Sequence, residues 1–385
     1  MWKGDIYQMI TKQYPINTSL EYTFEKEYNL DKIIFFDIET TGFSADNTYL
    51  YLIGCVYHQA ASFHIIQWFS EDIREERILL ATFFEFLREY DVMIHYNGTG
   101  FDIPYLLRKC VKLQLDYSFG NLISLDIYKK ISPYKKILGL ENYKQKTVED
   151  FFHVNREDVF DGGDLIQVYA NYLGRSHYEK LLGNHEPQNF LVVAPTSEEL
   201  LKQLLLHNED DLKGLLIITP ILLYADLFEK PFTITQSTVE SDILTINFKL
   251  PAPLPRSIRC SYGLISFTAL GCNASIKIPL VEGELKYFYD NYKDYYYLPE
   301  EDMSIHKSLA LFTSKEYRVK AKAANCYTKK QGVFIPQYDA ILAPSFKYNY
   351  QDKISYIEIN EELLVHQTKL DAYVSHLFKH LISGK

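Results

Sequence analysis

The strongest feature of the hydrophobic pattern is the stretch Ile33–Gly42, which reads IIFFDIETTG. Five of its first six residues are apolar and either β-branched or aromatic, which predicts a central strand buried on both faces. Two carboxylates, Asp37 and Glu39, interrupt this pattern near its end. Because side chains alternate along a strand, both acids should point to the same side, where the strand opens into a Thr-Thr-Gly turn.

The residues that follow alternate between strand-like and helix-like periods. The expected strands are Tyr49–His58, Ser62–Ser70, Asp91–Asn97 and Leu122–Lys129, and the expected helices are Arg74–Tyr90 and Phe101–Leu115. From Ile33 to Leu115 the order is therefore β-β-β-α-β-α. This order predicts an α/β fold with a mixed sheet flanked by helices, in which the later strands are parallel and joined by crossovers.

The rest of this half is expected to be helical. Short helices are predicted at Lys146–Val154 and Asp164–Gly174, and a long helical stretch at Ser197–Phe228. Ser197 is a plausible cap for the long helix, and Pro220 should kink or end it.

Beyond Lys230 the pattern changes to the alternation typical of strands. Strands are expected at Thr233–Leu250, Ser257–Ile278 and Lys286–Leu298, a connector at 251–257, and a terminal helix at Asn360–Ile382. We therefore predict three parts: a lead-in at 1–30 with a short helix and an extended segment, the α/β domain at 31–229, and a smaller β-rich (α+β) domain at 230–385.

Composition places the chain among ordinary soluble globular proteins, with 47% apolar and 23% charged residues in 385 positions. The first residues carry charges where an export signal needs a continuous apolar core, so no export signal is expected. Leu212–Phe228 is broken by charges and a proline, which argues against a membrane span and a membrane partner. Five widely spaced cysteines without a C-x-x-C pair favour reduced thiols and a cytoplasmic location.

Charge differs between the two predicted domains. Residues 1–229 hold 21 Lys+Arg and 34 Asp+Glu, a balance of −13, whereas residues 230–385 hold 19 and 16, a balance of +3. The acid excess therefore belongs to the α/β part, where a metal site would need some of it.

The two acids of the first strand are candidate metal ligands. Like charges at the mouth of an apolar strand repel each other and lose hydration, and a divalent cation such as Mg²⁺ or Mn²⁺ offsets both effects. The alternative is a strand that ends in a solvated acidic turn. Two further candidates lie in HYNGTGFD, where Asp102 starts a helix, and in LLLHNEDDL, where His207 and Asp211 share a helix face. Alone, Asp102 could be a helix-start charge and His207 a structural histidine.

Together, FFDIETTG, YNGTGFD and the helix with His207 and Asp211 closely resemble the three motifs of the DEDD (DnaQ-like) exonuclease superfamily, which has a ribonuclease H-like fold. The most similar subgroup is the YprB-type ribonuclease H-like domain, and the second motif also resembles the proofreading exonuclease of family B polymerases. The resemblance spans about Asp31 to Phe228. It implies a 3′→5′ exonuclease that hydrolyses phosphodiester bonds of single-stranded DNA or RNA by a two-metal-ion mechanism.

The resemblance also implies residue roles. Asp37, Glu39, Asp102 and Asp211 correspond to the ligands of two Mg²⁺ or Mn²⁺ ions, and Thr40, Asn97 and Phe101 to positions that contact the substrate. His207 corresponds to the group that orients or deprotonates water. However, the histidine variant of the superfamily usually has four residues between its His and Asp, whereas this chain has three, the spacing of the tyrosine variant. The choice between general base and positioning residue stays open.

An acidic catalytic half needs a cationic surface elsewhere to bind nucleic acid. The segment Lys315–Lys330 has six basic residues and one acid, and Arg318, Lys320 and Lys322 alternate as they would on one face of a strand. The alternative is an edge strand protected by lysines. For the whole chain, the rivals of an exonuclease are an endonuclease on structured nucleic acid and a binding or assembly module with little activity.

Overall fold

The computed structural model describes residues 9–24, 28–160, 162–182 and 195–383. It contains two compact units, of which the first comprises residues 1–132 and 140–222 and the second comprises 133–139 and 223–385. The expected boundary between residues 229 and 230 thus lies inside the second unit. The short segment Pro133–Gly139 also belongs there, because Tyr134 stacks on Phe228 at 5.4 Å and donates a hydrogen bond to Glu229 at 2.9 Å.

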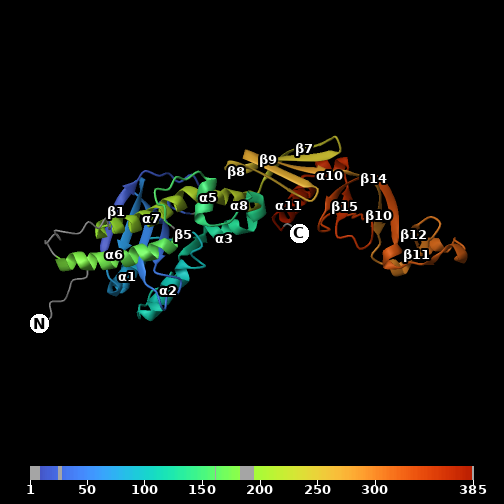
Figure 1. Ribbon diagram of the computed structural model, residues 1–385. Coiled ribbons are helices and arrows are strands. Elements are labelled where there is room, and N and C mark those ends of the chain that lie inside the picture. Colours follow the sequence, from blue (N-terminus) through green and yellow to red (C-terminus); the bar gives the residue numbers. More distant parts are fainter. Residues whose placement is uncertain (1–8, 25–27, 161, 183–194, 384–385) are drawn as a thin grey trace. The chain divides into compact units, whose positions relative to one another are not determined.

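The first unit is built on a six-stranded mixed sheet (Figure 1). Its strand order is β1-β4-β3-β2-β5-β6. The strands are β1 (Ile10–Ile16), β2 (Ile33–Thr40), β3 (Leu50–Gln59), β4 (Ser62–Phe69), β5 (Val92–His95) and β6 (Ile123–Asp126). The pairs from β1 to β2 are antiparallel, whereas β2, β5 and β6 run parallel. The predicted α/β fold with a mixed sheet and parallel later strands is confirmed.

Two strands differ from the prediction. β1 lies in the expected lead-in but pairs with β4 at the edge of the sheet. Most of its side chains are exposed, so its sequence lacks the alternation of a half-buried strand, and Pro15 is tolerated because the strand is at an edge. The expected strand Leu122–Lys129 is shorter than predicted, because the Asp126 side chain accepts a hydrogen bond from the Lys129 amide and starts α3 (Ile127–Ile131).

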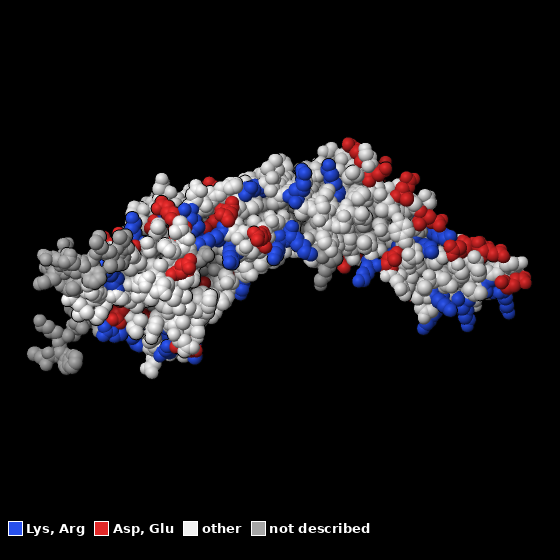
Figure 2. Space-filling view, in the orientation of Figure 1, with Lys and Arg blue, Asp and Glu red and all other residues white. Residues whose placement is uncertain are grey.

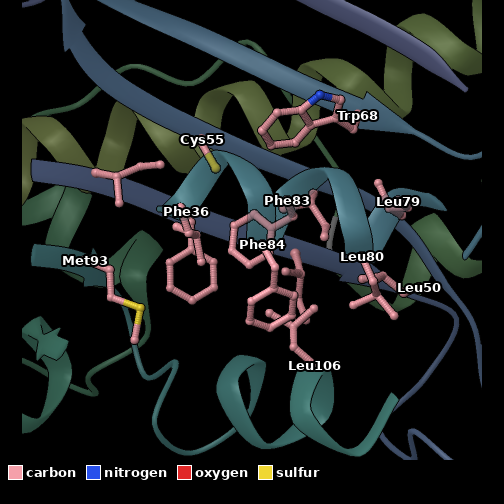
Figure 3. Packing of buried hydrophobic residues seen from close by; sticks show 14 of the residues in the cluster. Phe36, Leu50, Cys55, Trp68, Leu79, Leu80, Phe83, Phe84, Met93 and Leu106 are labelled. Carbon is pink, nitrogen blue, oxygen red and sulfur yellow. The ribbon is translucent and has the colours of Figure 1, made fainter. Parts of the chain in front are cut away.

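Helices cover both faces of the sheet. α1 (Glu76–Leu87) and α2 (Asp102–Lys112) pack on the face that carries Phe36, where rings of α1 and β2 meet in one buried cluster (Figure 3). α6 (Gly162–Leu182) and α7 (Ser197–Ile218) pack on the opposite face, against Tyr51 and Phe69. The remaining helices of this unit include α5 (Gln145–Phe151).

The long helix α7 begins and ends for clear chemical reasons. Its cap is Thr196, not Ser197: the Thr196 side chain accepts from the Glu199 amide, and the Glu199 side chain accepts from the Thr196 amide. At the other end, Pro220 lies in a short 3₁₀ turn, Thr219–Ile221, after which α8 (Leu222–Glu229) begins. The predicted interruption at Pro220 is therefore present.

The second unit is β-rich, as predicted, with three small antiparallel sheets of orders β7-β8-β9, β10-β14-β15 and β12-β11-β13. Its strands are β7 (Thr233–Glu240), β8 (Ile243–Tyr262), β9 (Ile265–Pro279), β10 (Val281–Phe288), β11 (Tyr295–Leu298), β12 (Met303–His306), β13 (Val319–Lys320), β14 (Tyr327–Gln337) and β15 (Ser355–Glu358). Its helices are α4 (Lys135–Leu138), α8, α9 (Lys307–Ala310), α10 (Glu361–Val365) and α11 (Gln367–Ser383).

The expected connector at 251–257 is instead part of the long strand β8. The chain stays extended there, but the register with β9 shifts between Lys249 and Leu254 and again before Ile258. Prolines lack an amide donor, so they break the hydrogen-bond ladder without ending the strand. In the described part of the chain, no helix is long and apolar enough to cross a membrane.

Candidate active site

The acids of β2 lie on the face of the sheet that α7 covers. Phe36 and Ile38 belong to the apolar cluster on the α1 face, so alternation directs Asp37 and Glu39 to the other face. Asp37 is paired across the sheet with Gly54 of β3. A Cβ atom on Gly54 would lie 2.0 Å from Oδ1 of Asn208. The missing side chain therefore allows α7 to lie directly against the sheet beside Asp37.

Asn208 holds Asp37 in place. Its Nδ2 donates to Oδ2 of Asp37 at 2.9 Å, and its Oδ1 accepts from Nε2 of Gln67 at 2.9 Å. Asn208 is fully buried, and the same Gln67 nitrogen also donates to the carbonyl of Leu205 at 2.8 Å. The orientation of Asp37 is thus fixed from both β4 and α7. Asn208 is not one of the motif residues, and its only sequence signal is a polar residue in a buried stripe of the helix.

His207, Glu39 and Asp211 form the centre of the site. One ligand atom from each lies within 4.8 Å of the others. Nε2 of His207 is 3.3 Å from Oδ2 of Asp211 and 3.7 Å from Oε1 of Glu39. His207 is 4% exposed, so its ring is enclosed by the protein with Nε2 facing these two carboxylates.

The other nitrogen of His207 contacts a residue that the motifs did not indicate. Nδ1 of His207 is 2.6 Å from Oδ2 of Asp158, which is itself buried. This contact favours the tautomer of His207 that carries its proton on Nδ1, since a carboxylate is a hydrogen-bond acceptor. Nε2 is thereby left facing the carboxylates of Glu39 and Asp211. A cation held by Glu39 and Asp211 would offset their charge, and a carboxylate behind an imidazole commonly fixes the orientation of its ring.

Asp210, which lies off the face shared by His207 and Asp211, fixes the loop that carries Asp158. Its Oδ2 accepts from the amides of Glu157 and Asp158, both at 2.8 Å. The same loop supplies Arg156, whose Nη1 donates to Oε2 of Glu149 at 2.8 Å. These loop residues give no periodic signal in the sequence.

Asp102, at the start of α2, lies in the same electrostatic environment. Its pKa is raised from 3.8 to about 7, mainly by burial and also by the charges of Asp126 and Asp211, while hydrogen bonds from the backbone amides of Asp102 and Ile38 lower it. Burial also raises the pKa of Asp37 and of Glu39. The charges of Asp211 and Asp102 add to both shifts, so the carboxylates of the three motifs influence one another electrostatically.

The predicted substrate-contact residues lie in the two turns beside this cluster. Oγ1 of Thr40 donates to the carbonyl of Gly42 at 2.9 Å and shapes the first turn. Asn97 is exposed, with a φ of 58°, and its carbonyl accepts from the Phe101 amide at 3.2 Å. The Phe101 ring contacts Phe43 edge-on, with centroids 5.9 Å apart, and Phe43 is 91% exposed. The sequence analysis did not identify Phe43.

The basic residues Arg318, Lys320 and Lys322 belong to the second unit. β13 is only two residues long, so the expected face of a regular strand is absent, and β13 forms the edge of its sheet. Arg318 lies over the Tyr296 ring at 4.9 Å. Within the described residues Lys320 and Lys322 have no ion pair, whereas Lys329 and Lys330 are paired with Asp302 and Glu358.

Charge is segregated at this end of the second unit. Figure 2 shows basic atoms along one edge of the region of β11 and β12 and acidic atoms along the opposite edge. The exposed side chains near β13 also include Phe312 and Tyr317, at 90% and 50% exposure. A surface with cations and exposed rings suits an anionic, aromatic ligand, and it is equally the pattern of a protected edge strand.

The donor set of the cluster fits a hard divalent cation. Glu39 and Asp211, which lie together with His207, supply carboxylate oxygens of the type that Mg²⁺ and Mn²⁺ bind. Burial first, and the neighbouring negative charges second, raise the pKa of Asp37, Glu39 and Asp102, and a bound cation would act against these shifts.

Comparison with known proteins agrees with this fold. Residues 34–222 match the family model of the RNase H superfamily, and no curated protein matches the chain. A family B DNA polymerase from the archaeon Pyrobaculum calidifontis is similar at 14% identity and a TM-score of 0.36, over 76% of this chain and 41% of the polymerase. The zinc-bound ExoI–ssDNA complex of E. coli is similar at 12% identity and a TM-score of 0.24, over 57% of this chain and 54% of ExoI. The chain thus spans less than two thirds of either structure.

Proposed function

Because residues 34–222 match the family model of the RNase H superfamily, we propose that this protein is a metal-dependent nuclease, and specifically a 3′→5′ exonuclease on single-stranded DNA or RNA. The observation that carries the proposal is the meeting of Glu39, His207 and Asp211 in one cluster, with Asp37 on the same face of β2 as Glu39 and the buried Asp102 at the start of α2. The direction and the exonuclease character come from the resemblance of the motifs.

Asp37, Glu39, Asp102 and Asp211 are the residues that would hold two Mg²⁺ or Mn²⁺ ions. Such ions lower the pKa of water and neutralise charge on the phosphate oxygens. Asn208 contributes by orienting Asp37.

His207 is the residue that would activate or position the attacking water. Asp158 anchors Nδ1 of its ring, so Nε2 points at the cluster, where it can accept a proton from the attacking water or hold that water in line. The two roles separate by experiment: loss of a general base changes the pH profile of kcat, whereas loss of a positioning group lowers kcat at every pH.

Substrate contact is assigned to three places. The exposed Phe43 and its neighbour Phe101 offer ring surface for the terminal base, and Thr40 and Asn97 shape the turns around it. In the second unit, Arg318, Lys320 and Lys322 supply positive charge for the phosphates of the strand.

The test uses purified protein, Mn²⁺ and end-labelled single- and double-stranded DNA and RNA, together with internally labelled circular single strands. We expect stepwise shortening of linear single strands from the 3′ end and no cleavage of circles. Cleavage of circles would make the protein an endonuclease. Binding without any Mn²⁺-dependent cleavage would make it a binding module.

The matched variants are Asp211→Asn and Asp371→Asn. Asp371 lies on α11 in the second unit and accepts a hydrogen bond from Gln367, so it controls for loss of an acid elsewhere. The Asp211 variant should be inactive and folded, and the Asp371 variant fully active.

A further inference from the structure

Arg156 is a nearly buried cation inside the carboxylate cluster. Its side chain is 11% exposed, and its Nη1 and Nη2 donate to Glu149 and Asp211 at 2.8 and 2.6 Å. Nη2 is also 3.7 Å from Oδ2 of Asp158. The guanidinium thus compensates part of the charge of three acids. Of these, Asp211 belongs to the proposed metal site, and Asp158 contacts that site through His207.

The two carboxylate oxygens of Asp211 have different partners. Oδ1 accepts from Arg156, whereas Oδ2 is the atom that lies 3.3 Å from Nε2 of His207. Only one oxygen of Asp211 is therefore available toward Glu39 and His207. A carboxylate can bind two cations when each oxygen takes one, and here the guanidinium already takes one of the two places.

Arg156 is held in this position from several sides. Nε2 of Gln145 donates to Oε1 of Glu149 at 2.8 Å and to the carbonyl of Asp211 at 2.7 Å, which ties α5 to α7. Gly214 on α7 leaves room for the Glu149 carboxylate, since a Cβ there would lie 2.1 Å from Oε1. The guanidinium is thus part of a built network.

We propose that Arg156 is a built-in cation that sets how many divalent ions the cluster holds. Asp37, Glu39 and Oδ2 of Asp211 would hold one ion tightly. The positive charge of the guanidinium, which already contacts Oδ1 of Asp211, would weaken the binding of a second ion. The inference rests on the proposed function, because it concerns the same carboxylates, and it adds a residue that the motifs do not contain.

The test is a calorimetric titration of metal-free protein with Mn²⁺, with wild type and Arg156→Met compared. For the wild type we expect one tight and one weak site. In the variant the weak site should become tighter by about tenfold or more, because a competing positive charge a few ångströms away is gone. The melting temperature of the metal-free variant should fall, because Glu149 and Asp158 lose their cation, and Mn²⁺ should raise it by more than in the wild type.

Two controls sharpen the result. Arg175→Met removes a more exposed arginine that pairs with Glu179 on α6, and it should leave both Mn²⁺ sites unchanged. Arg156→Lys keeps the charge and should keep the weak second site. A variant that is merely damaged would bind Mn²⁺ more weakly at both sites, the opposite of the expected change.

Equal isotherms for wild type and Arg156→Met, or two equally tight sites in the wild type, would overturn the inference and leave the nuclease proposal standing. A wild-type protein that binds no Mn²⁺ at all would overturn both.

Discussion

At the scale of single residues, the orientation of the acids depends on neutral neighbours. Asp37 accepts from Asn208, and Asn208 accepts from Gln67, so a chain of two hydrogen bonds fixes one carboxylate from behind. Such outer partners commonly determine metal affinity as strongly as some ligands do. The cost of the arrangement is electrostatic, because burial and the charges of Asp211 and Asp102 raise the pKa of Asp37.

The first prediction follows from that cost. A carboxyl whose folded-state pKa is raised destabilises the fold as pH rises above its ordinary value of 3.8, because the folded protein then resists losing the proton. Asp37→Asn should be inactive, because a proposed metal ligand is lost. Without metal at pH 7, however, the variant should melt at the same or a higher temperature than wild type, because the strained charge is gone. The difference should shrink toward pH 4. A clearly lower melting temperature of the variant at pH 7 would show that the cluster is not strained.

Sequence motifs were sufficient to propose the carboxylates and His207, because each belongs to a short pattern on a recognisable element. They were insufficient for Asn208, Asp158 and Arg156. Those residues act through contacts with distant segments; Asn208, for example, bonds a residue 171 positions away. Such contacts follow from packing in three dimensions, which no local period encodes.

At the scale of elements, α7 organises the site. Within one stretch of this helix, neighbouring side chains have different partners: His207 faces Glu39, Asn208 bonds Asp37 of β2, and Asp210 bonds the 157–158 loop. The helix can do this because it lies close to β3 at Gly54. Its distance from the sheet is therefore the quantity on which the geometry of the site depends.

Gly54→Ala tests that distance. The added Cβ would lie 2.0 Å from Oδ1 of Asn208 and 2.6 Å from Cδ1 of Leu212, so α7 must shift or Asn208 must turn away. We expect a loss of about 1–3 kcal/mol in the free energy of unfolding, and a fall in activity beyond what the stability loss explains. Gly174→Ala is the control, because a Cβ in that part of α6 meets nothing within 4 Å. Unchanged activity in Gly54→Ala would show that the site does not depend on this contact.

His95, at the end of β5, gives a pH-dependent prediction. It is 1% exposed, accepts from the Gly98 amide through Nδ1 at 3.0 Å, and burial lowers its pKa from 6.5 to about 4. As pH falls below 6.5, His95 becomes protonated in the unfolded chain, whereas in the folded protein it stays neutral until about pH 4. The free energy of unfolding therefore decreases across that range. The loss is at most about 3 kcal/mol.

His95→Asn keeps an acceptor for Gly98 and removes the titration. Its melting temperature should therefore fall less steeply between pH 6.5 and pH 4 than that of the wild type. The slopes are compared because the smaller side chain also changes packing. Parallel curves for the two proteins would contradict the assignment.

Elements with a strong period could be predicted from the sequence, and weakly patterned ones could not. The buried β2 and the amphipathic α1 follow directly from their apolar residues. β1 is mostly exposed at a sheet edge, and the 251–257 part of β8 contains prolines, so both segments lack the pattern that identifies a strand. The segment Pro133–Gly139 belongs to the second unit because of the contacts of Tyr134. These contacts cannot be predicted from the local sequence pattern.

At the scale of the whole molecule, charge is divided between the parts. Residues 1–229 carry −13 and residues 230–385 carry +3. The acidic part contains the carboxylate cluster, which by itself repels a phosphate backbone. Under the proposed function, positive charge for the substrate must therefore come from local groups, and exposed Lys320 and Lys322 are available in the second unit.

The double variant Lys320→Glu/Lys322→Glu tests this surface. We expect affinity for a fluorescent single-stranded oligonucleotide to fall by about tenfold and the slope of log K against log salt to decrease by about 2, while Mn²⁺ binding stays unchanged. The control is Lys369→Glu, which reverses a charge near Glu362, away from β13. Equal binding by the double variant and wild type would assign these lysines to protection of the β13 edge.

The most direct test of the four-carboxylate site is anomalous diffraction from crystals soaked with Mn²⁺. The account predicts a strong Mn²⁺ peak within about 2.2 Å of oxygens of Asp37, Glu39 and Asp211, with Asp102 beside it, and loss of that peak in Asp211→Asn crystals. Mn²⁺ bound only elsewhere on the molecule, with no peak at this cluster, would contradict it.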